Sequence, residues 1–342
     1  MARAQAVAAR ARIARGLTLV VLAAVLGVAV WQAVRPAHRA PTLLVGVDDD
    51  TLKWTPFPLT VVRRQEALGA QAVRVWVPWR GEAAPSPVRR VELSRAETAA
   101  RRTSVVLAVF GFARQTPATA RAQSRFCRYA REALDLVPDA RAVVVWNEAN
   151  SPTFWSGTPA QYEALLARCY DRLHSQRVAV LDSTASAHDP IAFLAAVASA
   201  HHESGRRRPL VDGFGHNPYP LTPIESPAAR HRGDFLGESD YPRLVATLRA
   251  GFGRPPSIWY LEDGFQTDWV TPAQQAHDVA AAISIAACQP LVHAFFNFEL
   301  VDERRLLGWQ SGLIWRGGRL KPAAAAYAAA ARAAEGGCHR SP

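Results

Sequence analysis

Lysine is nearly absent from this 342-residue sequence, in which Lys53 and Lys321 are the only two. Arginine therefore supplies almost all of the positive charge, and the formal net charge is +11. Six arginines flank one apolar stretch near the N-terminus, and subtracting them leaves +5 for the rest of the chain. The only tight basic run, 206–208, has no interleaved aromatic residues, so we interpret it as a solvated loop. The charge thus argues against a nucleic-acid partner.

Several motifs that would indicate other functions are also missing. No glycine-rich turn follows the first apolar run, where Val47 leads into three aspartates, which argues against a doubly wound nucleotide-binding fold. No G-x-S-x-G elbow surrounds Ser183 or Ser186, so a serine hydrolase is excluded. The His-His-Glu run at 201–203 lacks the spacing of metal ligands. The sequence predicts neither a metal site nor a cofactor.

The N-terminal region contains one long apolar segment. Residues 17–34 carry no charge, and this length is at the short end of what spans a bilayer core of about 30 Å. The arginines before it predict a cytoplasmic arm over 1–16 by the positive-inside rule, with a linker over 35–41. A cleaved signal peptide is the alternative. We therefore expect an extracytoplasmic domain with a single-pass transmembrane helix as membrane anchor, or a secreted domain if the segment is removed.

Four cysteines could pair in an oxidising compartment, and four cysteines allow three connectivities. Cys127 and Cys169 fall on consecutive predicted helices. Cys288 ends a late helix, and Cys338 lies in a tail (336–342) that should return beside it. We expect the bridges Cys127–Cys169 and Cys288–Cys338, with free buried thiols as the alternative.

Short β-rich runs alternate with helix-like segments about eight times across residues 42–335. The runs VVLAVF and AVVVW are continuously apolar, which is typical of parallel strands covered on both faces. Several helices are expected to begin at a proline after Thr or Asp, as at Thr158-Pro159, Asp189-Pro190 and Thr271-Pro272. Eight β-then-α units in one domain predict a (β/α)8 TIM barrel. The expected strands are 43–47, 72–77, 104–110, 142–146, 178–181, 211–215, 257–261 and 293–298, and the expected helices are 58–68, 94–101, 117–134, 159–174, 190–204, 241–251, 271–288 and 322–334.

Two glutamates stand at the ends of predicted strands that lie far apart round the ring. Glu148 follows the fourth strand in Trp146-Asn147-Glu148, and Glu262 follows the seventh in Leu261-Glu262. The active site of such a barrel is built from the carboxyl ends of its strands, so the two carboxyl groups should face each other across the mouth. Such a pair suits retaining hydrolysis of a glycosidic bond, in which one carboxyl protonates the departing oxygen and the other attacks the anomeric carbon.

These motifs resemble clan A of the glycoside hydrolases, which are retaining (β/α)8 enzymes, and within it families 5 and 39. The resemblance covers residues 42–334 and includes the late segments 308–313 and 318–322. It implies that Glu148 is the acid/base and Glu262 the nucleophile. Two departures stand out: Ala149 occupies a position where the clan usually has proline, and the eighth strand ends in Phe298 rather than the common tryptophan.

The resemblance also implies a set of substrate-binding residues. Asn147 would hydrogen-bond the sugar 2-hydroxyl, and Arg74 would lie beneath the nucleophile and lower its pKa. Tyr219 would hydrogen-bond Glu262, and His216 would line the adjacent subsite.

Ten tryptophans exceed what packing requires, and sugar faces stack well on aromatic rings. Four of them follow predicted strand ends, and Trp79 and Trp309 in particular are expected to bind substrate; the other two are Trp155 and Trp269.

The sequence thus predicts a retaining glycoside hydrolase that cleaves an envelope or extracellular polysaccharide, with β-linkages implied by the clan. The alternative from another class is a non-catalytic barrel that binds polysaccharide for exopolysaccharide assembly or export. Two opposed glutamates argue against the alternative, because a binding protein has no use for them.

Overall fold

The strands of this protein close into a barrel. A computed structural model describes residues 42–253, 257–303 and 308–338, and within them every pairing between named strands is parallel. Eight strands follow one another round the ring in the order β1, β2, β3, β4, β5, β7, β8, β9, and β9 pairs with β1. The short strand β6 pairs only with β7. The predicted (β/α)8 barrel is confirmed.

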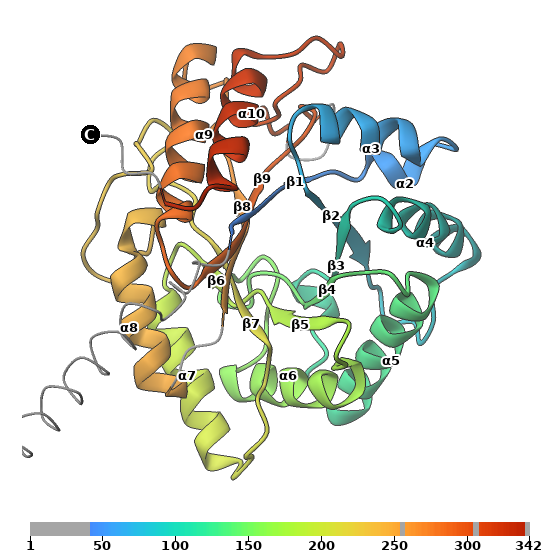
Figure 1. Ribbon diagram of the computed structural model, residues 1–342. Coiled ribbons are helices and arrows are strands. Elements are labelled where there is room, and N and C mark those ends of the chain that lie inside the picture. The colour runs from blue at the N-terminus through green and yellow to red at the C-terminus, as the bar shows by residue number, and fades with distance from the viewer. Residues whose placement is uncertain (1–41, 254–256, 304–307, 339–342) are drawn as a thin grey trace, which may run out of the picture. The chain divides into compact units, whose positions relative to one another are not determined.

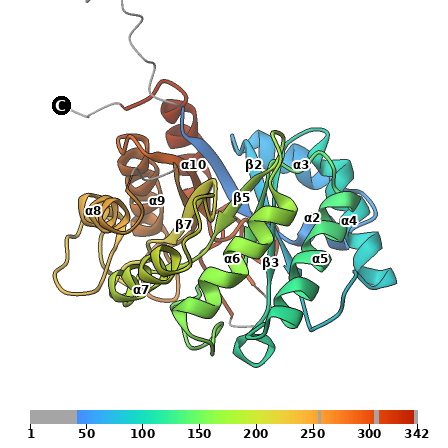
Figure 2. The same ribbon diagram turned by 90° about the horizontal axis from the view of Figure 1, so that it is seen from below.

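The strands are β1 (Leu44–Asp48), β2 (Ala72–Pro78), β3 (Ser104–Phe110), β4 (Ala142–Val145), β5 (Ala179–Asp182), β6 (Ala185–Ser186), β7 (Gly213–Asn217), β8 (Ser257–Asp263) and β9 (Val292–Asn297). The helices are α2 (Thr51–Trp54), α3 (Pro58–Ala67), α4 (Pro87–Ala100), α5 (Ala120–Leu136), α6 (Pro159–Leu173), α7 (Pro190–Glu203), α8 (Tyr241–Phe252), α9 (Pro272–Ala287) and α10 (Pro322–Ala334), with 3-10 turns η1 (Ala113–Gln115) and η2 (Glu238–Asp240). The helices surround the strands in both views, and α9 packs beside α10 (Figure 1, Figure 2).

The eight predicted strands and eight predicted helices are all present, but the sequence did not predict the short elements α2 and β6, and one helix starts well before its expected position. Helix α4 begins at Pro87 rather than at residue 94. The prediction missed this start because the first turns are weakly amphipathic and leave Val88 71% exposed. Its true start is marked by Ser86, whose side chain accepts a hydrogen bond from the Arg89 amide. The start of this helix is therefore marked by a polar cap, which the prediction from apolar periodicity missed.

Two of the three expected Thr/Asp-Pro helix starts carry a side-chain cap. Thr158 accepts from the Gln161 amide, and the Gln161 side chain accepts from the Thr158 amide in return. Thr271 accepts from the Gln274 amide. Asp189 makes no side-chain cap bond and adopts a left-handed backbone conformation with φ of 52°.

Alternate residues of the strands divide the core into two layers. The barrel interior holds small and medium side chains such as Ala72, Ala108 and Leu181, together with Phe296. Gly46 leaves room for Phe296, since a Cβ at this position would lie 2.6 Å from its ring. A larger apolar layer lies between the strands and the surrounding helices. At the carboxyl ends of the strands, side chains that point to the interior therefore line the mouth of the barrel. Their neighbours in the sequence point outward and are covered by helices.

Both expected disulfides are present. Cys127 and Cys169 join α5 to α6, and Cys288 joins the end of α9 to Cys338 in the C-terminal tail. The basic run forms a loop before β7 in which Arg206 pairs with Asp171 through both guanidinium nitrogens at 2.8 Å.

The predicted anchor over 17–34 lies outside the described residues. Among the helices of the described ranges, none has the length and apolar character needed to cross a membrane.

Candidate active site

The end of β4 breaks the alternation of side chains. Trp146 adopts φ of 71°, which an L-residue rarely does, and its ring joins Val145 in the layer beneath the helices. The indole nitrogen donates to the Phe154 carbonyl at 2.9 Å, and the ring packs against Trp79 and Trp155. Because two consecutive residues face outward, Asn147 turns to the interior side. The kink thus delivers the Asn-Glu pair to the mouth.

A second irregularity serves Glu262. Along β8 the pairing with β9 passes from Tyr260 to Asp263 while β9 advances only from Phe295 to Asn297, so β8 contains one extra residue. Such a bulge re-aims the side chains that follow it. Leu261 fills the barrel interior, and the next side chain, Glu262, also reaches interior groups despite the expected alternation.

Arg74 links three strands beneath the mouth. It is fully buried, and its Nη1 donates to Glu262 Oε1 at 2.9 Å and to Asp48 Oδ1 at 3.0 Å. Its Nη2 donates to Asn147 Oδ1 at 3.2 Å, and Ser183 Oγ donates to the same oxygen at 3.3 Å. Since the Asn147 oxygen is occupied in this way, its amide nitrogen remains to donate to a ligand.

The environment of Glu148 favours its protonated form. Burial raises its pKa to about 7, and the nearby charge of Glu262 acts in the same direction. Asn217 Nδ2 donates to Glu148 Oε1 at 2.9 Å, which opposes that rise only in part. The Ala149 amide donates to the Ser183 carbonyl at 3.2 Å, a bond that proline could not make. The alanine that departs from the clan pattern therefore has a local role.

Glu262 has an environment that favours its charge more than that of Glu148. Burial raises its pKa, but the Arg74 guanidinium opposes the rise through its charge and hydrogen bond. Tyr219 donates its hydroxyl to Glu262 Oε2 at 3.3 Å, and the Asn217 amide also lowers the pKa. Asp48 is the other carboxyl that accepts from Arg74, and burial raises its pKa well above the usual value. The negative charge beside Arg74 is therefore best placed on Glu262.

Three aromatic rings form a wall beside Glu262. The Tyr219 ring centroid lies 5.4 Å from Trp309 and 6.3 Å from Phe298, and Phe298 lies 5.3 Å from Trp309. All three rings are partly exposed. Phe298 thus occupies the strand-eight position where the clan commonly has tryptophan, within the same aromatic wall.

Some predicted site residues lie elsewhere. Trp79 is 3% exposed and packs edge-on against Phe126 and Trp146 between strands and helices, so it offers no face to a sugar. The His216 ring lies against Tyr260 with Nε2 2.9 Å from the Leu236 carbonyl, on the helix side of β7. Both expectations fail for the same reason: neighbouring positions of a strand end face opposite sides.

Two other tryptophans named from the sequence also lie away from Glu148 and Glu262. Trp155 is buried against Trp146, whereas Trp269 is 61% exposed. Glu299, which follows the eighth strand of the barrel, is a further carboxyl in this region, and burial together with the neighbouring Glu303 raises its pKa to about 10. A carboxyl that stays protonated in this way cannot serve as a nucleophile at neutral pH.

The sequence reasoning missed Asp48 and Asn217. Asp48 pairs with Arg74 in the register of β1 and β2, so both side chains project to the same side. Asn217 lies between the two residues that were chosen in the His-Asn-Pro-Tyr stretch, and strand alternation would have favoured it over His216. Across the described ranges, no group of three or more His, Cys, Asp or Glu residues is arranged to hold a metal ion.

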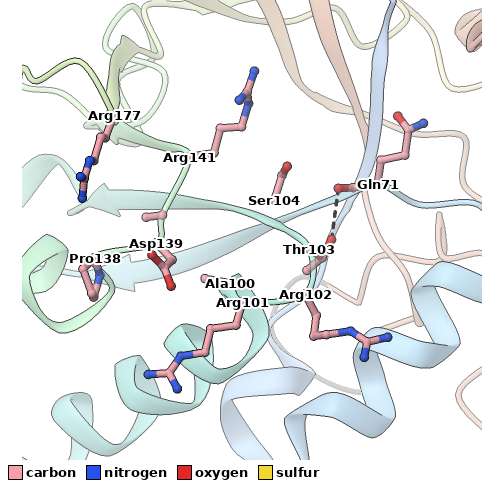
Figure 3. A pocket seen from close by; sticks show the side chains of 11 residues that line it. Gln71, Ala100, Arg101, Arg102, Thr103, Ser104, Pro138, Asp139, Arg141 and Arg177 are labelled. Carbon is pink, nitrogen blue, oxygen red and sulfur yellow. Dashed lines mark hydrogen bonds between the residues drawn. The ribbon is translucent and has the colours of Figure 1, made fainter.

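A cavity of about 510 Å³ lies at the amino ends of β3 and β4 and is separate from the carboxyl pair. Its lining includes Arg101, Arg102, Arg141 and Arg177, whose side chains point in different directions (Figure 3). Arg101 pairs with Glu97 on its own helix. The arginines do not converge on one point, so the cavity is not a second candidate for the reaction site.

Comparisons with known proteins identify solved structures that share this fold. No family profile and no curated protein matches the sequence. Among solved structures, a family 39 glycoside hydrolase from Bacteroides cellulosilyticus WH2 aligns with a TM-score of 0.68 at 16% identity, over 85% of this chain and 64% of that one. A family 5, subfamily 18 structure from Streptomyces cattleya, in complex with GlcNAc, aligns with a TM-score of 0.61 at 20% identity, over 86% and 81%. A family 128 endo-β-1,3-glucanase from Amycolatopsis mediterranei, in complex with laminaripentaose, aligns with a TM-score of 0.54 at 17% identity, over 84% and 99%. The chain spans about two thirds of the length of the family 39 structure. These likenesses show that it shares the (β/α)8 barrel fold of these glycoside hydrolases.

Proposed function

We propose that this protein is a retaining glycoside hydrolase with Glu148 as acid/base and Glu262 as nucleophile. The observation that carries the proposal is that two buried glutamates at separate strand ends share one cluster of partners: Asn217 donates to Glu148 at 2.9 Å, and Arg74, which donates to Asn147 beside Glu148, also donates to Glu262 at 2.9 Å. The charge of Glu262 also raises the pKa of Glu148, so the two carboxyl groups lie near each other, as a double displacement requires.

In the first step, Glu148 gives its proton to the glycosidic oxygen while the Glu262 carboxylate attacks the anomeric carbon, so the bond to the leaving group breaks as the bond to Glu262 forms. A pKa of about 7 keeps the Glu148 proton available near neutrality. In the second step, ionised Glu148 takes a proton from water, and the resulting hydroxyl displaces Glu262 from the sugar.

The surrounding residues position these two groups. Arg74 holds the Glu262 charge, and Tyr219 fixes its second oxygen. The Asn147 nitrogen is the donor for the sugar 2-hydroxyl, since its oxygen is already engaged by Arg74 and Ser183. The partly exposed rings of Tyr219 and Trp309 offer apolar surface to the sugar.

We propose a β-linked polysaccharide of the cell envelope or its surroundings as substrate. The β-linkage is supported by what the neighbouring structures contain, namely a Manβ1-4GlcNAc complex in one family 5 structure and laminaripentaose in the family 128 enzyme. A location outside the cytoplasm is supported by the two disulfides, which persist in oxidising compartments. The anchor over 17–34 remains a prediction.

The test is a screen of aryl glycosides and bacterial exopolysaccharides with three variants. Glu262→Gln should abolish turnover, and Glu148→Gln should spare only substrates with good leaving groups. Glu238→Gln is the matched control, because Glu238 on η2 is, like Glu262, a buried carboxyl, and burial raises its pKa well above the usual value. Wild-type rates in Glu262→Gln would end the assignment, and an initial product of inverted configuration by NMR would overturn the mechanism. Polysaccharide binding without any product would favour the non-catalytic alternative.

A further inference from the structure

Two phenylalanine rings lie at the carboxyl rim of the barrel, beyond the reactive pair. Phe112 follows β3 and is 47% exposed, and Phe154 lies in the loop after β4 and is partly exposed. Their centroids are 5.7 Å apart with an interplanar angle of 16°, so the two rings are nearly parallel. Clustered apolar side chains at a protein surface are typical of ligand-binding grooves, and this pair lies on the same rim as the ends of the strands that carry Glu148 and Glu262.

The pair is continuous with the reaction site. Phe110 at the end of β3 lies 5.7 Å from Phe112 and 6.4 Å from Phe154, and on its other side lies 4.7 Å from Trp76. The Arg74 guanidinium carbon is 4.1 Å from the centroid of the Trp76 ring. These four rings, which we call the aromatic strip (Trp76, Phe110, Phe112 and Phe154), therefore lead from the arginine beneath Glu262 to the surface.

The outer end of the strip is held in place by hydrogen bonds between its two loops. The Ala113 amide donates to the Thr153 carbonyl at 3.1 Å, and Ser156 Oγ donates to the Ala113 carbonyl at 2.8 Å. The Phe154 carbonyl accepts from the Trp146 indole at 2.9 Å, and Trp146 lies two residues before Glu148. Because the rings are fixed before any ligand arrives, a ligand pays little for ordering them.

We propose that Phe112 and Phe154 form an outer sugar subsite that binds a pyranose unit remote from the cleaved bond. This inference rests on the proposed function and narrows it to glycan chains that span several units. Pyranoses with mostly equatorial hydroxyls, as in β-glucans and β-mannans, expose C–H faces that can cover such rings and remove apolar surface from water. A single terminal sugar at the Glu148–Glu262 pair would leave the outer end of the strip bare.

The experiment compares long and short substrates on the full chain. The double variant Phe112→Ala/Phe154→Ala should lose about tenfold or more in kcat/KM on the hexasaccharide that wild type hydrolyses, chosen from β-1,3-glucan, β-1,4-glucan and β-1,4-mannan. Its kcat/KM on the p-nitrophenyl monosaccharide of the same sugar should stay within about twofold of wild type. Phe112→Tyr/Phe154→Tyr should restore the rate on the hexasaccharide, because it restores the ring faces.

The matched control is Phe57→Ala, since Phe57 is 70% exposed and contacts no other ring in the described part of the chain. It should leave both rates unchanged. Thermal melts of each variant check that the barrel is folded. Equal losses on long and short substrates, or no loss on either, would overturn the subsite while leaving the glycosidase assignment intact.

A binding experiment distinguishes failure of the outer subsite from failure of the proposed function. Calorimetric titration of the same hexasaccharides into Glu262→Gln, with and without the two phenylalanine substitutions, needs no turnover. Weaker binding in the triple variant supports the subsite even if wild type releases no product, and in that case only the proposed function fails. Absence of hexasaccharide binding to Glu262→Gln overturns the subsite.

Discussion

Replacement of Arg74 by methionine tests the electrostatic design of the site. Methionine keeps much of the volume of the stem but removes the charge that faces Asp48 and Glu262 and the bond to Asn147. Leaving a buried charge without its partner costs about 3–5 kcal/mol. For a barrel of about 300 residues the entropy of unfolding is roughly 0.6 kcal/mol/K, so we expect the Tm to fall by about 5–8 °C.

The same substitution should change the pH dependence of turnover. Arg74 lowers the pKa of Glu262, and the nucleophile must be ionised to react. Without Arg74 the pKa of Glu262 rises, so the acidic limb of the kcat/KM profile should move to higher pH and kcat should fall. The measurement is a pH profile of kcat/KM together with calorimetric melts of the wild type and the variant.

The control is Lys321→Met. Lys321 is a fully buried cation outside the reactive pair, and its Nζ binds Asp302 at 2.7 Å, the Gln310 carbonyl at 2.8 Å and Thr267 at 3.1 Å. Its loss should lower the Tm comparably and leave the acidic limb in place. An Arg74→Met variant whose acidic limb coincides with that of Lys321→Met would refute the reasoning, because Arg74 would then be only structural.

Three further outcomes follow from individual contacts. Since Glu148 must carry a proton to act as general acid and burial raises its pKa to about 7, kcat/KM should decline as pH rises above about 7, and a profile flat to pH 9 would contradict its role. Removing one disulfide as Cys288→Ser/Cys338→Ser should cost about 4 kcal/mol in the chain-entropy account for a separation of 50 residues, and an unchanged calorimetric Tm would oppose it. Ala149→Pro removes the amide that donates to the Ser183 carbonyl, so thermal melts should show a loss of about 1–3 kcal/mol, whereas equal or greater stability would mean that the clan's usual proline fits here.

The barrel could be predicted from the sequence because its strands are continuous apolar runs that are easy to recognise. Runs such as 105–110 are apolar at every position, since a parallel strand is covered by the barrel interior on one side and by helices on the other. Helix α4 was the exception at its start, where an exposed, weakly amphipathic first turn gives no periodic signal. Fold prediction thus succeeded where burial dictates residue type and weakened where it does not.

The two glutamates could also be found, because their strand-end positions and their flanking residues are local patterns. The residues that surround the two glutamates were harder to predict. Whether each one reaches the site depends on whether its side chain points to the barrel interior or to the helices. His216 was preferred to Asn217, and Trp79 was expected in the cleft although its ring turns to the helices. Asp48 carries no motif of its own, and only the register of β1 against β2 brings it to Arg74.

The alternation of inward and outward side chains expected from the sequence is broken at Trp146 and at Glu262. These two irregularities bring Asn147 and Glu262 to the interior side. At Trp146 a positive φ turns two consecutive side chains outward, and Glu148 itself adopts φ of 39°. Left-handed conformations of non-glycine residues cost of order 1–3 kcal/mol each and persist only where the surroundings impose them. Here the surroundings are identifiable: the indole bond to Phe154 and the Ala149 bond to Ser183 hold the loop on both sides of Glu148. A strand that simply continued its alternation would place Trp146 in the mouth and Asn147 under the helices. The departure from regular geometry is therefore what brings the Asn-Glu pair to face Glu262.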